Sequence, residues 1–475
     1  MDSLLNHIPS LLLLETVLLA LYSHAGGMPL FFSIFAAELF LISQALAGEE
    51  KWERRKSEVF LTVLFLAVLI PWNLTGRLAK QAALPSHISE NFTVAERFSW
   101  SEKAMLLLKG ESGTSWLAPA GGALQNASEG ERYYLSAAVI PFRETTLRSS
   151  FSPLKYWRSR GVDGELRGIR DIRQLQEIFS IHTLRRFLRG RINRLPVQCR
   201  ALTAAVLLGD RDANLREDYR RWGISHILAV SGWHVGLAVA LGCIIFGVGR
   251  SGLILCSMLL WAYCFLSGAS VSAVRAALMV QAAIAGLLTG NKANTLNSVG
   301  VAGLVMLLWN PWTLYDLGWQ LSVLAAVVVA AMSASIHILS MVFVSPLMWL
   351  LTSPLIAPLA GGSYFSSLPV NVMASAFFGF ILGFVLLASL PTLLGFNGAY
   401  FSLPAEMLLR CWGSIADQWV EWLPEALPVN YFPSWICAGV LFFVVSRAIK
   451  ISLARTAALT VVGSLTMFIF SSVWV

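Results

Sequence analysis

The feature that most constrains this chain is a long stretch almost without charge. Between Lys292 and Glu406 the only Asp, Glu, Lys or Arg is Asp316. The whole chain of 475 residues is 56% hydrophobic and 13% charged, whereas a soluble domain is about 25% charged. A stretch of this kind is accommodated in lipid as helices, because a helix satisfies its own backbone hydrogen bonds. The sequence therefore predicts a polytopic α-helical membrane protein and excludes a soluble one.

Apolar segments predict about eleven or twelve membrane spans. Basic loops at 48–58 and 447–455 are placed in the cytoplasm by the positive-inside rule, so residues 75–200 are expected outside the cell (inner) membrane. Charged and aromatic residues alternate over 406–423, which favours an amphipathic helix on the membrane surface. The expected spans are 8–22, 28–47, 59–74, 225–249, 251–267, 271–289, 296–309, 317–332, 336–360, 369–394, 433–449 and 457–474.

The outer region divides into two patterns. Short apolar runs at 92–95, 104–108 and 133–140 lie between Gly, Ser and Asn clusters, which is typical of a small β-barrel or sandwich. From residue 152 to 200 the pattern becomes helical and basic. Residues 132–200 hold fifteen Lys and Arg against five Asp and Glu, a balance of +10, so the rest of the chain sums to −2. The predicted domains are N-terminal membrane spans (1–74), an extracytoplasmic β-domain (75–165), a basic helical and amphipathic connector (166–224) and the main transmembrane domain (225–475).

Basic and aromatic residues interleave in the outer region. Cationic side chains that follow phosphates, together with rings that stack bases, are the means by which proteins bind single strands without sequence preference. The alternative is a helix that lies in solvent or faces lipid headgroups. The DNA-binding candidates are Lys155, Tyr156, Trp157, Arg158, Arg160, Arg185, Arg186 and Arg189.

Polar residues within the apolar body form a second group of candidates. Such groups usually face partners or a water-filled path, and a mid-membrane Arg275 costs about 2.5–3.5 kcal/mol unless it is paired or wet. Asp316 is its natural partner, in a structural pair or beside a pore. Two glycines four residues apart permit close helix packing. The channel or pore candidates are Asp210, Arg211, His226, Ser231, Gly232, His234, Gly236, Arg275, Asp316, Gln320 and Asn371.

The sequence contains no motif for nucleotide binding, metal binding or CxxC redox chemistry. There is no Walker A pattern or dinucleotide fingerprint, the seven histidines have no ligand-like spacing, and none of the six cysteines forms a CxxC pair. We therefore expect no cofactor, no metal and no catalytic residue. A membrane-embedded hydrolase that uses Ser231, His234 and Asp210 stays as an alternative, although the GxSxG elbow is absent, and a small-solute exporter is another.

Several segments, in the order of the family's own motifs, resemble the ComEC-type DNA-internalisation competence family over about residues 60–450. The resemblance is carried by SPLKYWRSRGV (152–162), AVLLGDR (205–211), GISHILAVSGWHVGL (223–237), SVSAVRAALM (270–279), LYDLGWQLSVLA (314–325) and LPVNVMA (368–374). Trp233 stands where the family usually has Leu, and Ser270 stands where it usually has Pro. The C-terminal metallo-β-lactamase-like domain of many relatives, with its His-x-His-x-Asp-His motif, has no counterpart in this sequence.

The resemblance implies an inner-membrane channel that passes one strand of transforming DNA into the cytoplasm. It also implies an OB-like fold for the outer domain and a channel within 225–475. The implied partners are single-stranded DNA, a DNA receptor, a separate nuclease, a cytoplasmic helicase-like motor and membrane lipid. The oligomeric state stays open, as does whether Arg275 contacts phosphate or only Asp316.

Overall fold

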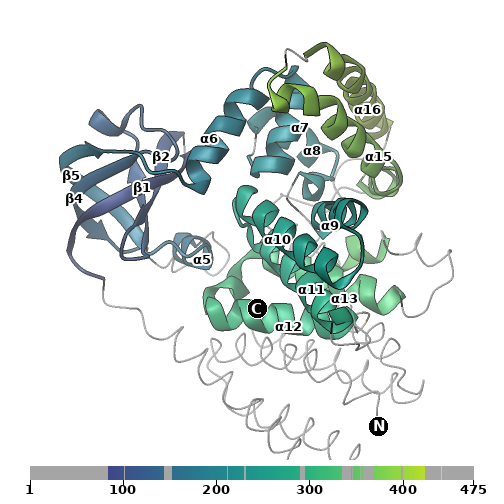
Figure 1. The fold of residues 1–475 in the computed structure, drawn as a ribbon, viewed down its shortest axis with the longest axis horizontal. Coiled ribbons are helices and arrows are strands. Elements are labelled where there is room, and N and C mark those ends of the chain that lie inside the picture. The colour runs from purple at the N-terminus through teal and green to yellow at the C-terminus, as the bar shows by residue number, and fades with distance from the viewer. Residues whose placement is uncertain are drawn as a thin grey trace, which may run out of the picture.

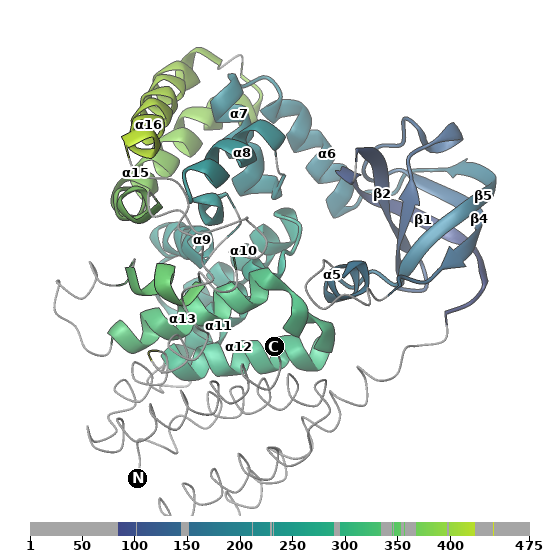
Figure 2. The same ribbon diagram turned by 180° about the vertical axis from the view of Figure 1, so that it is seen from behind.

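The computed structural model places a small β-barrel beside a larger helical body (Figures 1 and 2). It describes residues 84–100, 102–143, 152–210, 212–228, 232–288, 295–333, 346–352, 367–396 and 399–422, with a few single residues between them. The spans expected before residue 75 and after residue 432, the cytoplasmic loops and most of 336–360 lie outside these residues. The expected total of eleven or twelve spans therefore stays a prediction.

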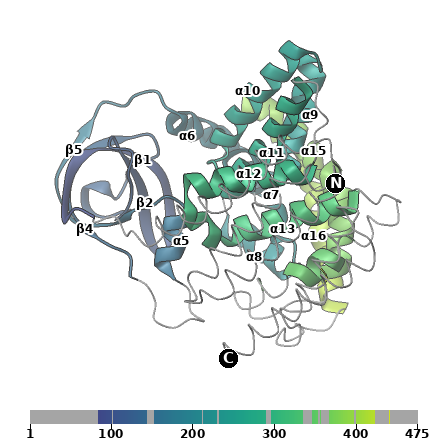
Figure 3. The same cartoon turned by 90° about the horizontal axis from the view of Figure 1, so that it is seen from below.

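The β-domain is a closed barrel of five strands in the order β1-β2-β3-β5-β4 (Figure 3). β3 and β5 pair in parallel, and the other pairs are antiparallel. Alternate residues point inward, where Phe92, Leu106, Trp116 and Leu135 are fully or almost fully buried. The strands are β1 (His87–Trp100), β2 (Lys103–Gly110), β3 (Ser115–Pro119), β4 (Arg132–Ile140) and β5 (Gly164–Leu175).

The expected small β-domain is confirmed, and its runs at 92–95, 104–108 and 133–140 fall within β1, β2 and β4. The boundary at residue 165 is wrong, because β5 continues the barrel to Leu175. The register of β4 against β5 shifts twice, and Gly168 and Asp171 have positive φ. These irregularities bring an apolar residue to the inside at every third position (Leu166, Ile169 and Ile172). That spacing is close to the helical period, which explains the wrong helical prediction for this segment.

Helices follow the barrel. The segments expected at 251–267, 271–289, 296–309, 317–332 and 369–394 each form a helix with bounds that differ by one or two residues, whereas the segment expected at 225–249 is divided. The helices are α5 (Pro153–Ser159), α6 (Ile181–Ile192), α7 (Val197–Leu208), α8 (Ala213–Arg221), α9 (Gly232–Phe246), α10 (Arg250–Leu266), α11 (Val271–Leu288), α12 (Thr295–Trp309), α13 (Leu317–Ser333), α15 (Ser367–Leu394) and α16 (Leu403–Trp422), with short 3-10 turns η2 (Gly122–Leu124), η3 (Ser225–Ile227), η4 (Pro311–Tyr315) and η5 (Ala399–Ser402).

Within the described residues, two helical stretches, Val271–Leu288 and Phe377–Leu394, are long and apolar enough to cross a membrane. Several shorter apolar helices accompany them, including α9 and α10. The part of the chain that the structure describes is therefore mostly helical with one small β-barrel.

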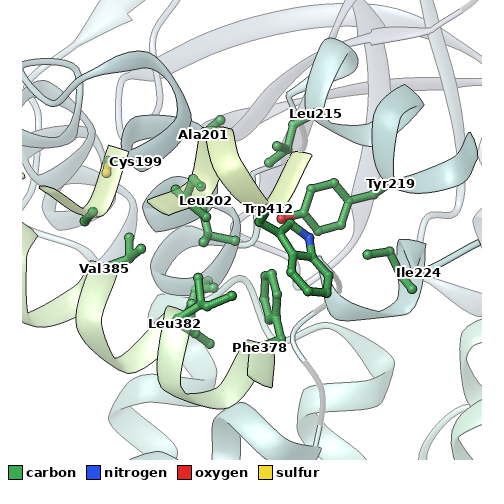
Figure 4. Close-up of a cluster of buried hydrophobic side chains, with 14 of the residues drawn as sticks. Cys199, Ala201, Leu202, Leu215, Tyr219, Ile224, Phe378, Leu382, Val385 and Trp412 are labelled. Carbon is green, nitrogen blue, oxygen red and sulfur yellow. The ribbon is translucent and has the colours of Figure 1, made fainter. Parts of the chain in front are cut away.

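The largest buried cluster lies where α7, α8, α15 and α16 meet (Figure 4). Tyr219 is packed against Trp222 and Phe378, with ring centroids 5.0 and 6.0 Å apart, and Phe378 also contacts Trp412 at 6.1 Å. Because Trp412 belongs to α16, one face of this amphipathic helix packs on protein. Its carboxylate Glu406 is also buried, and accepts hydrogen bonds from the first backbone N–H groups of α7, at Gln198 and Cys199.

Candidate functional site: the junction of barrel and helical body

The first contact between the barrel domain and the helical body joins α5 to η4. Asn310 donates from its amide to the carbonyl oxygens of Arg158 and Ser159, at 2.9 and 3.2 Å, at the end of α5. Beside it, Arg160 Nε lies 3.9 Å from Asp316 Oδ2, and the ammonium of Lys155 lies 5.1 Å from the centre of the Tyr315 ring. The segment 152–162 therefore packs on the segment 314–325, two of the motifs that the sequence singles out.

Within α5, the expected base-stacking rings are used in packing. Trp157 is 6% exposed, and its ring lies 5.7 Å from Phe98, 5.0 Å from Trp100 and 6.5 Å from Phe142. This burial leaves Trp157 unable to stack a base, which corrects its assignment as a DNA contact. Tyr156 packs against the same cluster, with its ring 5.1 Å from Trp100 and 5.0 Å from Trp157.

The basic residues of α5 also have protein partners. Arg158 Nη1 lies 2.7 Å from Asp163 Oδ1, and both side chains are largely buried. The guanidinium of Arg160 lies 4.0 Å from the centre of the Tyr156 ring, in addition to facing Asp316. The interleaved charges and rings of this segment therefore build the junction, and their expected role in DNA binding stays a prediction that this placement does not favour.

The second contact is an ionic network that joins the barrel to α6 and α7. Glu129, in the loop before β4, is 4% exposed, and its Oε2 lies 2.7 Å from Arg189 Nη1. Arg189 also donates from Nε and Nη2 to the two carboxylate oxygens of Asp210, at 2.8 and 2.7 Å. Arg185, buried beside them, lies 3.9 Å from Glu129 and 3.8 Å from Asp210. Burial alone would lower the pKa of Arg189, but the bonds to Asp210 and Glu129 outweigh it and raise that pKa.

Beside this network a further arginine of α6 also has carboxylate partners. Arg186 pairs with Glu177 at 2.5 Å and lies 3.7 Å from Glu131. Burial, with a bond to Glu131, raises the pKa of Tyr133 to about 12. In the first turn of α6, burial and the nearby cations Lys109 and Arg185 lower the pKa of His182 to about 4. Part of the basic charge of α6 is therefore offset locally by acidic residues, which the sequence balance did not indicate.

Two glycines allow the network to pack against the helical body. Gly209 ends α7 with φ +70°, and a Cβ there would run into the carbonyl oxygen of Ser267. Gly268 follows with φ +86°, and a Cβ there would lie 2.7 Å from Arg185 Nη1. The end of the motif at 205–211 therefore meets the loop that precedes the motif at 270–279, directly under Arg185.

The motif segment 223–237 is not one continuous helix. His226 belongs to the turn η3, and α9 begins at Gly232, so the expected span 225–249 is broken at this point. The side chain of His226, and Arg211 and Ser231 as a whole, lie outside the described residues. Gly223 accepts a hydrogen bond of 3.4 Å from the Asn371 amide, which joins the start of this segment to α15.

At the start of α9, His234 is 4% exposed and lies beside Trp233. The Trp233 ring fits over Gly379 of α15, where an added Cβ would lie 2.7 Å from it, so this substitution for the usual Leu has a matching space. Among the described residues, the close approach expected at Gly232 and Gly236 is not found: an added Cβ at Gly232 meets Ala276 at an ordinary 3.8 Å, and one at Gly236 has no neighbour within 4 Å. The close approach occurs at Gly242, where the Cβ would lie 3.1 Å from Cys256 Sγ.

Arg275 is 5% exposed and does not pair with Asp316 in the structure. Its Nε donates to Ser322 Oγ at 2.7 Å, and Ser322 Oγ lies 3.1 Å from Ser272 Oγ. Its Nη1 contacts Met279 Sδ at 3.0 Å. The expected pair is therefore wrong, and the partners that the sequence reasoning missed are the Ser322 hydroxyl of the motif at 314–325 and the Met279 thioether of the motif at 270–279.

Asp316 and Gln320 organise their own helix start. Asp316 accepts from the Trp319 backbone N–H at 2.9 Å, and Gln320 donates from its amide to the Leu314 carbonyl oxygen at 2.8 Å. Sequence reasoning also missed Glu129 and Asn310, for which only tertiary contacts give a signal. Among the residues that the structure describes, no group of three or more His, Cys, Asp or Glu side chains could hold a metal ion.

Comparison with known proteins gives one family and one named relative. The sequence model of a family described as "Competence protein" matches residues 206–454. ComE operon protein 3 of Bacillus subtilis (strain 168) is 34% identical over 135 residues, which covers 27% of this chain and 17% of that protein. The match thus spans less than a fifth of the length of that relative. No solved structure matches the chain.

Proposed function

Because the chain belongs to the competence protein family, we propose that it is a multi-pass protein of the cell (inner) membrane that passes single-stranded transforming DNA into the cytoplasm. The observation that carries the proposal is the family match over residues 206–454. It is supported by the apolar helices α11 and α15, and by the meeting of four of the motif segments, 152–162, 205–211, 270–279 and 314–325, at or beside the junction of barrel and body.

The outer domain supports the proposal through its strand order. A five-stranded Greek-key barrel with one parallel closing pair is the architecture of OB-type domains, many of which bind oligonucleotides. Its order β1-β2-β3-β5-β4 follows that pattern. The barrel is held to the helical body at two places, by α5 on η4 and by Arg189 between Glu129 and Asp210. A strand bound on the barrel would therefore have a fixed position relative to the body.

Buried polar groups in the body are the proposed lining or support of the path. The Arg275 guanidinium contacts a neutral hydroxyl and a thioether. Such surroundings suit a site at which the phosphates of a passing strand neutralise the arginine one after another. The proposal assigns no catalytic residue, so the driving force and the strand-degrading step belong to a separate motor and nuclease, and delivery belongs to a DNA receptor. Asp210 gives both carboxylate oxygens to Arg189, which does not favour the alternative hydrolase in which Asp210 orients His234.

The test is transformation of a naturally competent host that lacks its own gene for this protein. In this deletion strain we expect labelled DNA to accumulate outside the inner membrane and not to enter the cytoplasm. Expression of the intact chain should restore internalisation. Arg275→Ala should not restore internalisation, whereas Arg216→Ala, an exposed change on α8, should. Immunoblots verify that each variant accumulates. Normal internalisation in the deletion strain, or export of a small solute as the restored activity, would contradict the proposal.

A further inference from the structure

One strand of the barrel, β5, carries an arginine at every third position, and these arginines take no part in the contacts of the junction. In β5 the sequence Arg167-Gly168-Ile169-Arg170-Asp171-Ile172-Arg173 repeats an arginine every three residues. In an ordinary strand, alternate arginines of such a repeat would point into the barrel. The two register shifts between β4 and β5, with positive φ at Gly168 and Asp171, prevent this. Arg167, Arg170 and Arg173, which we call the β5 arginine row, therefore all lie on the outside.

The row lies beside small and polar side chains of the neighbouring strand. Arg167 is opposite Ala138, Arg170 is opposite Ser136, and Arg173 is opposite Tyr134. Tyr134 is half-buried, which leaves part of its ring open on this face. In the next strand, His87, Ser89 and Asn91 of β1 continue the same three lines across the sheet. The face is thus a polar strip with one aromatic ring and three aligned cations.

The cations of this row differ from those at the junction. Arg167 is bound by Glu165 at 3.0 Å, yet its side chain is 62% exposed. Arg170 and Arg173 are exposed, and no ion pair to either is found among the residues that the structure describes. By contrast, Arg158, Arg185 and Arg189 are held by carboxylates of the protein. The β5 arginine row therefore groups available positive charge of the outer domain on one strand.

The face that OB-type domains commonly use is not available here. Oligonucleotides usually lie across strands 2 and 3 of such barrels. In this chain the outward residues Met105 of β2 and Leu117 of β3 are buried under Trp157 and Val162, in and just after α5. The β4 and β5 strands, in turn, form the side of the barrel away from the helical body, where none of the described helices covers them (Figures 1 and 2).

The geometry points to the outer β4–β5 face as the surface on which the phosphates of a single-stranded polynucleotide lie, an inference that rests on the proposed function. Successive arginines are two ladder positions apart, about 6.6–6.8 Å, which suits successive phosphates of an extended single strand. Tyr134 supplies a ring beside Arg173 on which a base can stack. Insertion into a membrane surface would require exposed apolar anchors, and the outward residues of these rows are arginine, tyrosine, serine, asparagine, histidine and alanine.

The test uses the full chain in nanodiscs of uncharged lipid, with fluorescence anisotropy of a labelled oligothymidine at several salt concentrations. Arg170→Ala/Arg173→Ala should lower the slope of log affinity against log salt by about 1.4, because each phosphate contact contributes about 0.7. That change corresponds to about 25-fold weaker binding at 0.1 M salt and to little difference at 1 M. Arg170→Lys/Arg173→Lys should keep the slope. The matched control, Lys103→Ala/Arg143→Ala, removes two exposed charges elsewhere in the outer region and should bind like the original chain.

The outcomes separate this inference from the proposed function. An original chain that binds no oligothymidine and restores no internalisation would contradict the proposed function itself. An original chain that binds, with an Arg170→Ala/Arg173→Ala variant of equal affinity and slope, would overturn only the assignment of this face. If that variant instead loses binding to anionic vesicles and keeps oligothymidine binding, the face is a lipid surface and the inference is wrong.

Discussion

Arg189 is the point at which a single substitution should separate the barrel from the helical body. Its guanidinium lies between Glu129 of the barrel and Asp210 at the end of α7, with contacts of 2.7 Å to each. Arg189→Met removes these contacts and keeps much of the aliphatic stem. Glu129, 4% exposed, would then keep only Arg185, at 3.9 Å. A buried carboxylate is left largely uncompensated.

The expected magnitude follows from this burial. Breaking a fully buried pair costs about 3–5 kcal/mol, and Arg189 and Asp210 are each about a quarter exposed, so the lower end of about 3 kcal/mol applies. A change of 1.4 kcal/mol is about tenfold in an equilibrium constant. Amides of α6 and of the loop before β4 should therefore exchange hydrogen about 100-fold faster in Arg189→Met.

The assay is hydrogen exchange with mass spectrometry on the full chain in nanodiscs. Arg186→Met is the matched control on the same helix, since its pair with Glu177 is exposed on both sides, and such surface pairs contribute about 0–1 kcal/mol. Adding Glu129→Gln to Arg189→Met should recover much of the protection, because the uncompensated charge is gone. Losses that simply add in the double variant, or equal exchange in Arg189→Met and Arg186→Met, would refute the reasoning.

Three further predictions concern other parts of the chain. Since Arg275 binds Ser322 and not Asp316, Arg275→Ala and Asp316→Asn should reduce internalisation independently, and a double variant less impaired than the product of the single effects would contradict this placement. Burial and nearby cations hold the pKa of His182 at about 4 in the folded chain, against about 6.5 when unfolded. The folding stability should therefore fall as the pH drops from about 6.5 to 4. In thermal melts, His182→Gln should lose this contribution to the dependence of stability on pH. A cysteine at Ser112 should react with an impermeant thiol reagent in intact cells and one at Ser57 should not, and equal labelling would contradict the expected topology.

Much of the helical architecture follows from sequence alone. The apolar segments at 251–267, 271–289, 296–309, 317–332 and 369–394 correspond to α10 to α13 and α15 within one or two residues. Local capping also contributes: Asn310 directly follows α12, and its side chain accepts from the Trp312 N–H at the start of η4. Composition and periodicity suffice here because helix formation and burial of an apolar face depend on neighbours close in sequence.

In the β5 segment, the spacing of apolar residues predicts the wrong type of secondary structure. Its apolar residues recur every third position, and only the pairing with β4 reveals that two irregularities, at Gly168 and Asp171, produce this spacing within a strand. The same irregularities decide that Arg167, Arg170 and Arg173 share the outer face. No local pattern distinguishes Arg170 and Arg173 from Arg189 of α6, although the first two are exposed without an ion pair among the described residues and Arg189 is held by two carboxylates.

The sequence by itself determined that the chain is largely helical, that a small β-domain precedes the helices, and which polar residues are unusual enough to deserve a role. The tertiary structure decided which of them meet: Arg189 with Glu129 and Asp210, Asn310 with the end of α5, and Arg275 with Ser322. Element type is governed by short-range periodicity and capping, whereas a charge or hydrogen bond is satisfied by whichever group the packing brings within about 3 Å. Partners separated by 21 to 152 positions in the sequence leave no trace in it until the chain has folded.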